Sequence, residues 1–136
     1  EFPLLFCGDT LFSAGCGRLF EGTPAQMHDS LGKFMRLPDT MRVYCTHEYT
    51  LSNLKFAQAV EPHNAELAAY VARCQQLRAQ NFPTLPSSIG VEKQINPFLR
   101  SREATVRQAV ATHDPLASTD DVSVFATLRA WKNVFR

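Results

Sequence analysis

Two side chains that can bind a metal or carry a proton follow two apolar segments of the chain. Asp9 follows the apolar run at 2–7 after a single glycine, and His47 follows the short run at 42–46. Folds of the α/β class place ligands and catalytic groups at the carboxyl ends of buried strands. A carboxylate and an imidazole brought together there are suitable ligands for zinc, iron or manganese. The alternative for each residue is structural: Asp9 as part of an ordinary turn, and His47 as a hydrogen-bonded packing residue.

The four cysteines of the sequence offer a second chemistry. A cysteine nucleophile beside His47 is one interpretation, with Cys7, Cys16 or Cys45 as the thiol. Cys7 and Cys45 lie inside apolar segments, however, where thiols are usually inert. The sequence has no Cys-x-x-Cys pair, no Gly-x-Ser-x-Gly motif and no complete glycine-rich phosphate motif. We therefore expect reduced thiols, as in a cytoplasmic protein.

Arg129 and Lys132 form a basic pair near the end of the sequence. Their spacing of three residues puts them on one face of a helix, where they can bind a carboxylate. Solvated surface charge is the alternative. The charge distribution agrees with an anion pocket. Residues 1–68 hold five Lys/Arg and eight Asp/Glu, a balance of −3, whereas residues 69–136 hold nine and five, a balance of +4.

Composition excludes several broad classes of protein. The chain has 136 residues, 45% of them hydrophobic and 20% charged, with a net charge of +1, which is typical of a globular domain. Basic residues are scattered, so the sequence predicts no nucleic-acid partner. The longest apolar runs are far shorter than the roughly 20 residues that span a bilayer, so it also predicts no membrane association.

The elements that must position these residues begin with two strands. The run at 2–7 predicts a strand buried on both faces, and the run at 42–46 predicts a second short strand. Between them Thr23 begins a helix, because Pro24 stands at its first position and Gln26 completes a capping box. That helix carries an apolar stripe at helical spacing, formed by Met27, Leu31, Phe34 and Met35.

Helical periodicity dominates the rest of the chain. Only the segment 82–96 lacks a clear period, which predicts an extended connection. Strands alternating with a helix, followed by a run of helices, predict an α/β layer structure with an appended helical module. Two strands alone make a marginal sheet, so we expect residues 1–49 to be part of a larger unit. The predicted later helices cover 51–60, 64–80 with Asn64 as cap, about 101–111 with Ser101 as cap, and a last one capped by Thr119, Asp120 and Asp121.

Five strings of the sequence follow one another in a recognisable order: CGDTLF at 7–12, GCGRLFEGT at 15–23, THEYT at 46–50, NPFLR at 96–100 and LRAWK at 128–132. Together they resemble glyoxalase II, the hydroxyacylglutathione hydrolases of the metallo-β-lactamase superfamily, and most closely the bacterial members. The resemblance covers essentially all 136 residues. It implies the C-terminal part of an αββα metallo-β-lactamase sandwich at 1–49, followed by an all-helical domain at 50–136 that binds the glutathione thioester.

The resemblance implies an enzyme, a thiolester hydrolase of methylglyoxal detoxification in the cytoplasm. The implied reaction converts S-D-lactoylglutathione and water to D-lactate and glutathione, with a metal-bound hydroxide attacking the thioester. Asp9 matches the aspartate that bridges two divalent metals, zinc or else iron or manganese. His47 matches a terminal histidine ligand of one of them. Both residues are thereby implied as metal ligands and as members of the catalytic centre.

For the substrate, the resemblance implies a second set of residues. Tyr49 matches a tyrosine that binds glutathione, and Arg129 and Lys132 match a basic pair on the last helix. Arg18 falls at the position of a basic contact residue. Phe20 stands where many members carry tyrosine, so one hydroxyl contact is absent. Glutathione carries two carboxylates and one ammonium, which agrees with the positive balance of the second half of the chain.

One departure from the family is large. Its T-H-x-H-x-D-H motif and a further histidine, which together supply most of the metal ligands, are absent from this sequence. Asp9 and His47 alone cannot complete a catalytic zinc site, which needs three protein ligands. We therefore predict the C-terminal half of a glyoxalase II that is inactive, and binds no metal stably, on its own.

A half-sandwich leaves a strand edge and an apolar sheet face uncovered. This predicts self-association or pairing with the missing N-terminal half. The alternative function is a non-catalytic truncated module that binds glutathione-like anions or a partner protein. A third candidate is another superfamily thioesterase or a sulfur dioxygenase, against which the helical stretch with its basic pair argues.

Overall fold

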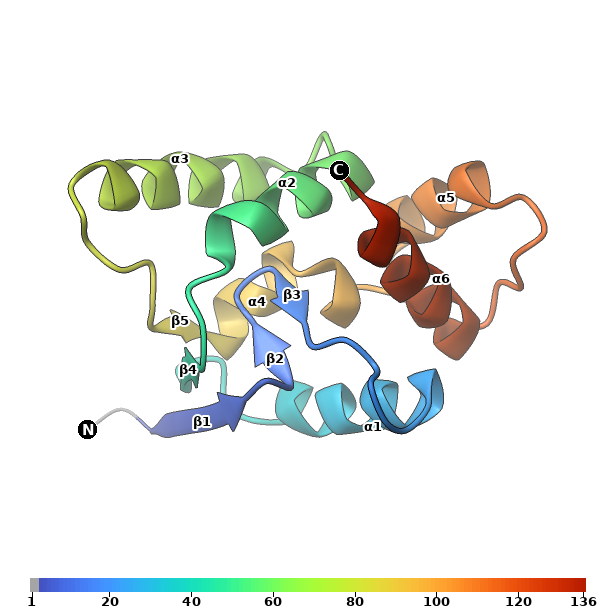
Figure 1. The fold of residues 1–136 in the computed structure, drawn as a ribbon, viewed down its shortest axis with the longest axis horizontal. Coiled ribbons are helices and arrows are strands. Elements are labelled where there is room, and N and C mark those ends of the chain that lie inside the picture. The colour runs from blue at the N-terminus through green and yellow to red at the C-terminus, as the bar shows by residue number, and fades with distance from the viewer. Residues whose placement is uncertain (1–2) are drawn as a thin grey trace.

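The computed structural model describes residues 3–136, and over these residues it combines six α-helices with five short strands (Figure 1). The predicted mixture of strands and helices is confirmed. None of the helices within these residues is both long enough and apolar enough to cross a membrane. In chain order the elements are β1 (Leu4–Gly8), β2 (Leu11–Phe12), β3 (Gly15–Cys16), α1 (Pro24–Met35), β4 (Arg42–Cys45), α2 (Thr50–Val60), α3 (Ala65–Ala79), β5 (Ser87–Ser88), α4 (Ile89–Ile95), the 3₁₀ helix η1 (Pro97–Leu99), α5 (Ala104–His113) and α6 (Asp121–Val134).

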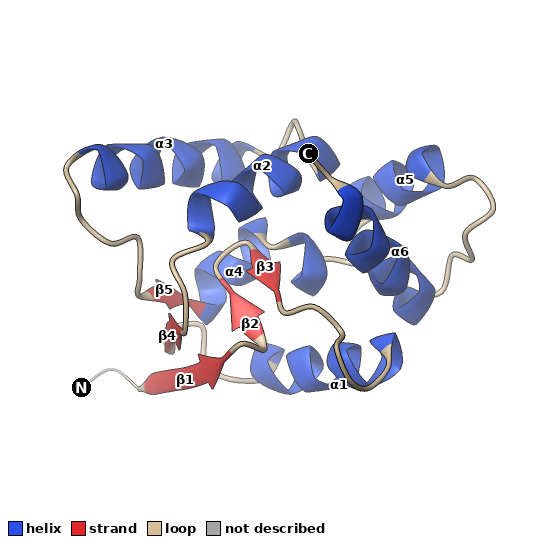
Figure 2. Ribbon diagram, viewed as in Figure 1, coloured by secondary structure: helices blue, strands red, loops and turns tan. Residues whose placement is uncertain are grey.

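The predicted strand–loop–helix–strand unit is present at the start of the chain (Figure 2). β1 and β4 pair in parallel, with Leu5 opposite Val43, and β5 adds to β4 in antiparallel, so the sheet order is β1-β4-β5. The Thr46 N–H donates to the Gly8 carbonyl over 3.2 Å, which continues the pairing to the strand ends. Since parallel strands end at the same edge of a sheet, the residues that follow β1 and β4 lie side by side.

The start of α1 forms as its sequence predicts. The Thr23 hydroxyl accepts a hydrogen bond from the Gln26 N–H over 3.2 Å, and the Gln26 side chain accepts one from the Thr23 N–H over 2.9 Å. Leu31 is buried at the centre of the apolar stripe, and Met27, Phe34 and Met35 pack against the core around it. A capping box and an apolar stripe depend only on residues close together in the sequence, so contacts with distant residues do not alter them.

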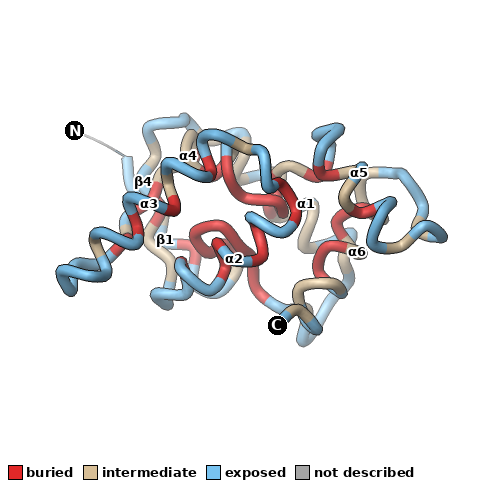
Figure 3. Tube along the Cα trace, turned by 90° about the horizontal axis from the view of Figure 1, so that it is seen from above, coloured by how far each residue is buried: buried red, intermediate tan, exposed pale blue. Residues whose placement is uncertain are grey.

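The core draws on both halves of the chain. Its larger cluster includes Val43 from the sheet together with Phe56, Phe98 and Phe125 from the helical part. The ring centroids of Phe56 and Phe98 lie 6.0 Å apart, and those of Phe98 and Phe125 lie 5.8 Å apart. Buried segments gather in the middle of the molecule and exposed ones at its periphery (Figure 3). Residues 1–49 and 50–136 thus share one core, and their division into two domains stays a prediction.

The prediction that the first strand is buried on both faces is wrong. Within β1 the side chain of Phe6 is 74% exposed and that of Leu4 is 50% exposed, whereas Cys7 is buried. Successive side chains of a strand point to opposite faces, so one face of β1 packs inward and the other is open. On that open face the Phe6 ring stacks on Tyr44 of β4, with centroids 5.3 Å apart.

The prediction of an extended connection over 82–96 is also wrong, because this segment contains β5 and α4. The Ser88 hydroxyl caps α4 by accepting a hydrogen bond from the Val91 N–H over 3.2 Å. The buried face of α4 is formed by Ile89, Glu92 and Ile95. A glutamate in the centre of the buried face hides the apolar stripe from a reading of hydrophobic periodicity.

Of the caps predicted for the last two helices, the one for α6 forms and the one for α5 does not. Asp120 caps α6 as predicted, since its carboxylate accepts a hydrogen bond from the Ser123 N–H over 3.0 Å. Ser101 does not cap α5, which follows Glu103 instead. The Ser101 hydroxyl donates to the carboxylate of Asp121, far along the chain, and this contact draws it away from the helix end.

Candidate functional site

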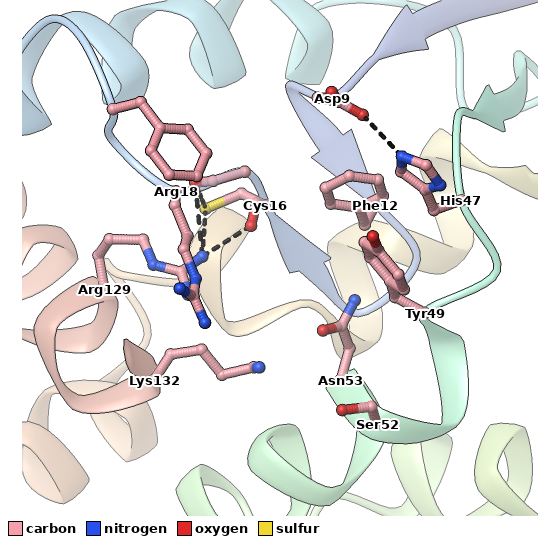
Figure 4. Close-up of a pocket in the computed structure, with 12 residues that line it drawn as sticks. Asp9, Phe12, Cys16, Arg18, His47, Tyr49, Ser52, Asn53, Arg129 and Lys132 are labelled. Carbon is pink, nitrogen blue, oxygen red and sulfur yellow. Dashed lines mark hydrogen bonds and ion pairs between the residues drawn. The ribbon is translucent and has the colours of Figure 1, made fainter. Parts of the chain in front are cut away.

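A cavity of about 440 Å³ lies between the carboxyl edge of the sheet, the β2–β3 hairpin, the first turn of α2 and the last turns of α6 (Figure 4). Its size is in the range of small-molecule pockets. The structure brings all of the sequence-predicted site residues to it, from four separate parts of the chain. They are Asp9, Arg18, Phe20, His47, Tyr49, Arg129 and Lys132.

Five further residues that line the cavity were not among the predicted metal-binding or substrate-binding residues, although Cys16 was one of the three candidate thiols. Phe12 and Cys16 belong to strings that mark the family, so a signal for them was present. Ser52 and Asn53 carry no signal, because they reach the cavity only through the position of the first turn of α2. The five are Phe12, Cys16, Gly17, Ser52 and Asn53.

Asp9 and His47 stand together at one end of the cavity. The pairing of β1 with β4 sets Gly8 opposite Cys45, so the loops that leave both strands start from neighbouring points. The distance from Asp9 Oδ1 to His47 Nε2 is 3.7 Å, and the two side chains are 71% and 48% exposed respectively. A carboxylate and an imidazole are therefore held within reach of one ion, in contact with solvent.

The donor set at this end is partial. Carboxylate oxygen and imidazole nitrogen are both ligand types for zinc, iron and manganese. Among residues 3–136, however, no group of three or more His, Cys, Asp or Glu side chains is placed to hold a metal ion. A catalytic zinc takes three protein ligands and leaves one position open. The residues of this chain thus fit part of a metal site and do not complete one.

An aromatic wall lines the cavity beside this end. The rings of His47 and Tyr49 stack with centroids 4.9 Å apart and an interplanar angle of 20°. Phe12 packs against Tyr49 with centroids 5.1 Å apart. Stacking fixes the orientation of the His47 imidazole although its side chain is half exposed.

Three cations gather at the opposite end of the cavity. Arg18 is exposed, Lys132 is half-buried and Arg129 is buried. No carboxylate within residues 3–136 forms an ion pair with any of them. Burial, together with the neighbouring charges of Arg129 and Arg18, lowers the pKa of Lys132. An unpaired cluster of this kind attracts anions, and a carboxylate is the simplest partner for a guanidinium.

Arg129 does more than line the cavity. Its Nη1 donates to the Cys16 carbonyl over 2.6 Å and to the Gly17 carbonyl over 3.4 Å (Figure 4). The guanidinium lies over the Phe98 ring, 5.0 Å from its centroid, and its Nε is buried without a hydrogen-bond partner within the described chain. One nitrogen of the predicted carboxylate clamp therefore holds the protein backbone, while no hydrogen bond within residues 3–136 involves Nη2.

The loop between β1 and α1 joins the two ends of the cavity. A Cβ atom at Gly17 would lie 2.1 Å from the carbonyl oxygen of Asp9, so only glycine allows this approach. Ala14, in the turn of the hairpin, has φ of +60°, a left-handed conformation that costs a non-glycine residue roughly 1–2 kcal/mol. Asn53 supports the turn by donating from Nδ2 to the Ser13 carbonyl over 3.1 Å. The glycines of this loop thus serve close packing rather than phosphate binding.

The cysteines near the cavity are poor nucleophiles. Burial raises the pKa of Cys16 to about 11 in spite of the nearby Arg129. Burial likewise raises the pKa of Cys7 to about 11 and raises that of Cys45. Because the thiolate is the reactive form, a cysteine mechanism beside His47 is disfavoured. All four cysteines are free thiols.

The fold and the cavity define an α/β unit with a cation cluster at one end of its cavity and a carboxylate–imidazole pair at the other, and comparison with known proteins specifies the family. Residues 48–135 match the family model described as hydroxyacylglutathione hydrolase C-terminus. The chain is 66% identical over 133 residues to a hydroxyacylglutathione hydrolase of Albidiferax ferrireducens, with 98% of this chain and 52% of that protein covered. It is 63% identical over 134 residues to one of Cupriavidus taiwanensis, covering 98% and 50%. It is 56% identical over 133 residues to one of Pseudomonas syringae pv. syringae, covering 98% and 51%.

The chain belongs to the hydroxyacylglutathione hydrolase family, as the five sequence strings predict. It spans about half the length of the relatives that it matches. The third candidate, another branch of the superfamily, is disfavoured because these relatives carry the hydroxyacylglutathione hydrolase name.

Proposed function

We propose that this chain supplies the glutathione-binding face, and two of the metal ligands, of a hydroxyacylglutathione hydrolase. The complete enzyme would convert S-D-lactoylglutathione and water to D-lactate and glutathione. The observation that carries this proposal is the single cavity in which a cation cluster faces a carboxylate–imidazole pair. The names of the relatives supply the substrate class, which the cavity alone does not specify.

The cation end suits the chemistry of glutathione. The tripeptide carries two carboxylates, and three side chains without carboxylate partners in the described chain offer charge to them: Arg18, Lys132 and the Nη2 edge of Arg129. Tyr49 adds a hydroxyl donor on the aromatic wall. Phe20, which is 86% exposed, contributes apolar surface and no hydrogen bond at its position. We propose these five residues as the substrate-binding set.

The other end suits the thioester group. We propose Asp9 and His47 as ligands in a centre of two divalent ions, zinc or else iron or manganese, whose remaining ligands lie outside this chain. Divalent ions, when bound, polarise a carbonyl and make water more acidic, which is the chemistry that thioester hydrolysis requires. The part that Asp9 and His47 play is to present one oxygen and one nitrogen at a fixed separation. On its own the chain is proposed to hold no stoichiometric metal and to hydrolyse no thioester.

The open face of β1 suits the rest of the proposed fold. Leu4, Phe6 and Tyr44 leave apolar surface beside the sheet, and Phe6 is 74% exposed. We propose that residues 1–49 complete an αββα metallo-β-lactamase sandwich by pairing with an N-terminal half, and that the chain self-associates through this face in its absence. The free thiols suit a cytoplasmic location, which is part of the same proposal.

Titration calorimetry with S-hexylglutathione tests the substrate-binding part. The chain should bind one equivalent, and Lys132→Met should weaken binding more than tenfold because a hydrogen bond to a charged group contributes about 1.5–3 kcal/mol. Lys55→Met is the matched control, since Lys55 is exposed on α2 and does not line the cavity. If the folded chain binds no S-hexylglutathione, the proposed substrate-binding role is wrong.

One observation also favours the alternative of a non-catalytic binding module: the cation end is complete, whereas the metal-ligating end is partial. Mixing the chain with a separately expressed N-terminal half of one of the relatives separates the two functions. Restored hydrolysis of S-D-lactoylglutathione that is lost again in Asp9→Asn supports the enzyme. Binding of S-hexylglutathione without hydrolysis in a complex shown to contain both halves supports the module.

A further inference from the structure

A glutamate is buried beneath the β2–β3 hairpin, which lines the cavity. Glu92 is fully buried on α4. Its Oε1 accepts from the Ala14 N–H over 2.7 Å and from Asn96 Nδ2 over 3.0 Å. Its Oε2 accepts from the hydroxyls of Ser13 over 2.9 Å and Ser87 over 2.5 Å. Donors from three separate segments thus converge on one carboxylate.

No cation within residues 3–136 forms an ion pair with Glu92. Burial raises the pKa of Glu92, which reflects the difficulty of holding a charge without a countercharge. A hydrophobic residue at this position would leave four buried donors without an acceptor. The carboxylate therefore serves hydrogen bonding rather than general packing.

Glu92 accepts a hydrogen bond from the strained residue of the hairpin turn. Ala14, whose N–H it accepts, has φ of +60°. Strained conformations persist where their surroundings over-determine them, and they cluster at functional sites. Asn96, itself bound to Glu92, also donates to the carbonyls of Phe12 and Gly15.

The position of the hairpin turn affects the cavity through the backbone of β3. Directly after the turn, β3 presents the Cys16 carbonyl to Arg129 Nη1 over 2.6 Å. The next residue, Gly17, contacts the backbone of Asp9 and donates its N–H to the Thr10 carbonyl over 3.1 Å. A shift of the turn would therefore move the carbonyl that orients the Arg129 guanidinium.

We infer that Glu92 is a positioning residue for the anion-binding end: it fixes the β2–β3 turn and, through the Cys16 and Gly17 carbonyls, the guanidinium of Arg129. The residue touches neither cavity nor ligand, and it acts through the backbone. The ligand used below rests on the proposed function, whereas the measurements on the hairpin do not.

The test compares Glu92→Met, which has similar length and no acceptor, with Glu92→Gln, whose amide can satisfy the same four partners. NMR of the free chain should show amide exchange at Ala14 accelerated about tenfold or more in Glu92→Met, and a displaced Arg129 Nε–H signal. Affinity for S-hexylglutathione should fall about tenfold, and Glu92→Gln should keep all three properties within about threefold of the parent.

Glu61→Met is the matched control. Glu61 is also a buried glutamate, but it pairs with Arg100, at 2.7 Å, and lies outside the cavity. This control should lose stability while Ala14 exchange, measured relative to core amides of α2, stays unchanged. Unchanged Ala14 exchange and Arg129 signal in Glu92→Met, or equal changes in Glu61→Met, would overturn the inference.

If Glu92→Met does not fold, two milder substitutions test the same inference. Ser13→Ala removes the hydroxyl that contacts both Glu92 and Tyr70, whereas Tyr70→Phe removes only the second contact. Ser13→Ala should accelerate Ala14 exchange several-fold more than Tyr70→Phe, and equal effects would overturn the inference. A parent chain with no affinity for S-hexylglutathione would defeat the proposed function, while the exchange and Arg129 signals would still decide the role of Glu92.

Discussion

The two ends of the cavity are built in opposite ways. Asp9 and His47 are exposed, 3.7 Å apart, and their orientation depends on strand ends and on stacking with Tyr49. Arg129 is buried and is held by the carbonyls of Cys16 and Gly17 and by the Phe98 ring. The chain thus builds its cation end from its own residues, whereas no third ligand-type side chain within residues 3–136 joins Asp9 and His47. Substitutions at the two ends should therefore have unequal effects.

The largest effect is expected for Arg129→Met. It removes the hydrogen bonds to the hairpin and leaves the Cys16 carbonyl without its donor, so unfolding free energy should fall by about 2–4 kcal/mol, as for other broken buried charged contacts. Affinity for S-hexylglutathione should fall about a hundredfold or more, since the proposed contact of Arg129 Nη2 with the ligand is lost together with the hairpin position. Urea unfolding and calorimetry measure the two losses.

Arg107→Met is the control for this substitution. Arg107 is partly buried on α5, donates to the Thr119 carbonyl over 2.7 Å and does not line the cavity. It should lose some stability and leave the affinity unchanged. An Arg129→Met chain with parental stability would show that the hairpin does not depend on this guanidinium.

A smaller effect, with opposite signs for binding and folding, is expected for Lys132→Met. Affinity should fall roughly tenfold to a hundredfold because a charged contact is lost. Stability of the ligand-free chain should rise by a few tenths of a kcal/mol, since the substitution removes a half-buried cation from the neighbourhood of Arg129 and Arg18. A stability loss above about 1 kcal/mol would contradict the view that this cation serves a ligand rather than the fold.

The lowered pKa of Lys132 also predicts a pH dependence. The unfolded chain holds the Lys132 proton more tightly than the folded chain does, so the stability of the ligand-free chain should rise with pH between the lowered pKa and the ordinary 10.5. Affinity for a carboxylate ligand should fall over the same range, because the charged form is lost. The difference between parent and Lys132→Met, measured by urea unfolding at several pH values, isolates this contribution. A flat difference would contradict it.

The smallest effects are expected at Asp9 and His47, the proposed metal ligands. Asp9→Asn and His47→Gln should each change the stability of the isolated chain by less than about 0.5 kcal/mol, because the Asp9 side chain is largely exposed and that of His47 is half exposed. Neither should weaken S-hexylglutathione binding by more than about twofold. A loss of 2 kcal/mol or more in unfolding free energy on either substitution would mean that this side chain stabilises the fold. The contrast between the two ends would then disappear.

The sequence predicts best what is decided locally. The capping box at Thr23 and the cap at Asp120 follow from contacts within three residues, and both form as predicted. The meeting of Asp9 and His47 follows from the general rule that parallel strands end at one edge. The basic pair Arg129 and Lys132 follows from its helical spacing. Arg18, Phe20 and Tyr49 were found only through the family resemblance, which gives their positions without a physical reason for them.

Contacts between distant residues were not predictable. Arg129 reaches Cys16 across 113 positions, and Glu92 reaches Ser13 across 79. A charged residue in a sequence suggests an exposed position, so nothing marked Glu92 as buried or α4 as a helix. The open face of β1 was missed for the opposite reason: an apolar run suggests burial on both faces, whereas Phe6 is exposed.

The most direct test of the central claim is NMR mapping of S-hexylglutathione on the 136-residue chain. We predict that the largest chemical-shift changes fall on the amides of Tyr49, Asn53 and Lys132 and on the Arg129 side chain. A second cavity of about 930 Å³ lies between the α2–α3 connection and α5, lined by His63, Thr105 and Trp131 among others. Changes confined to that second cavity, or no changes in a folded chain, would contradict the claim that the cation end is the glutathione site.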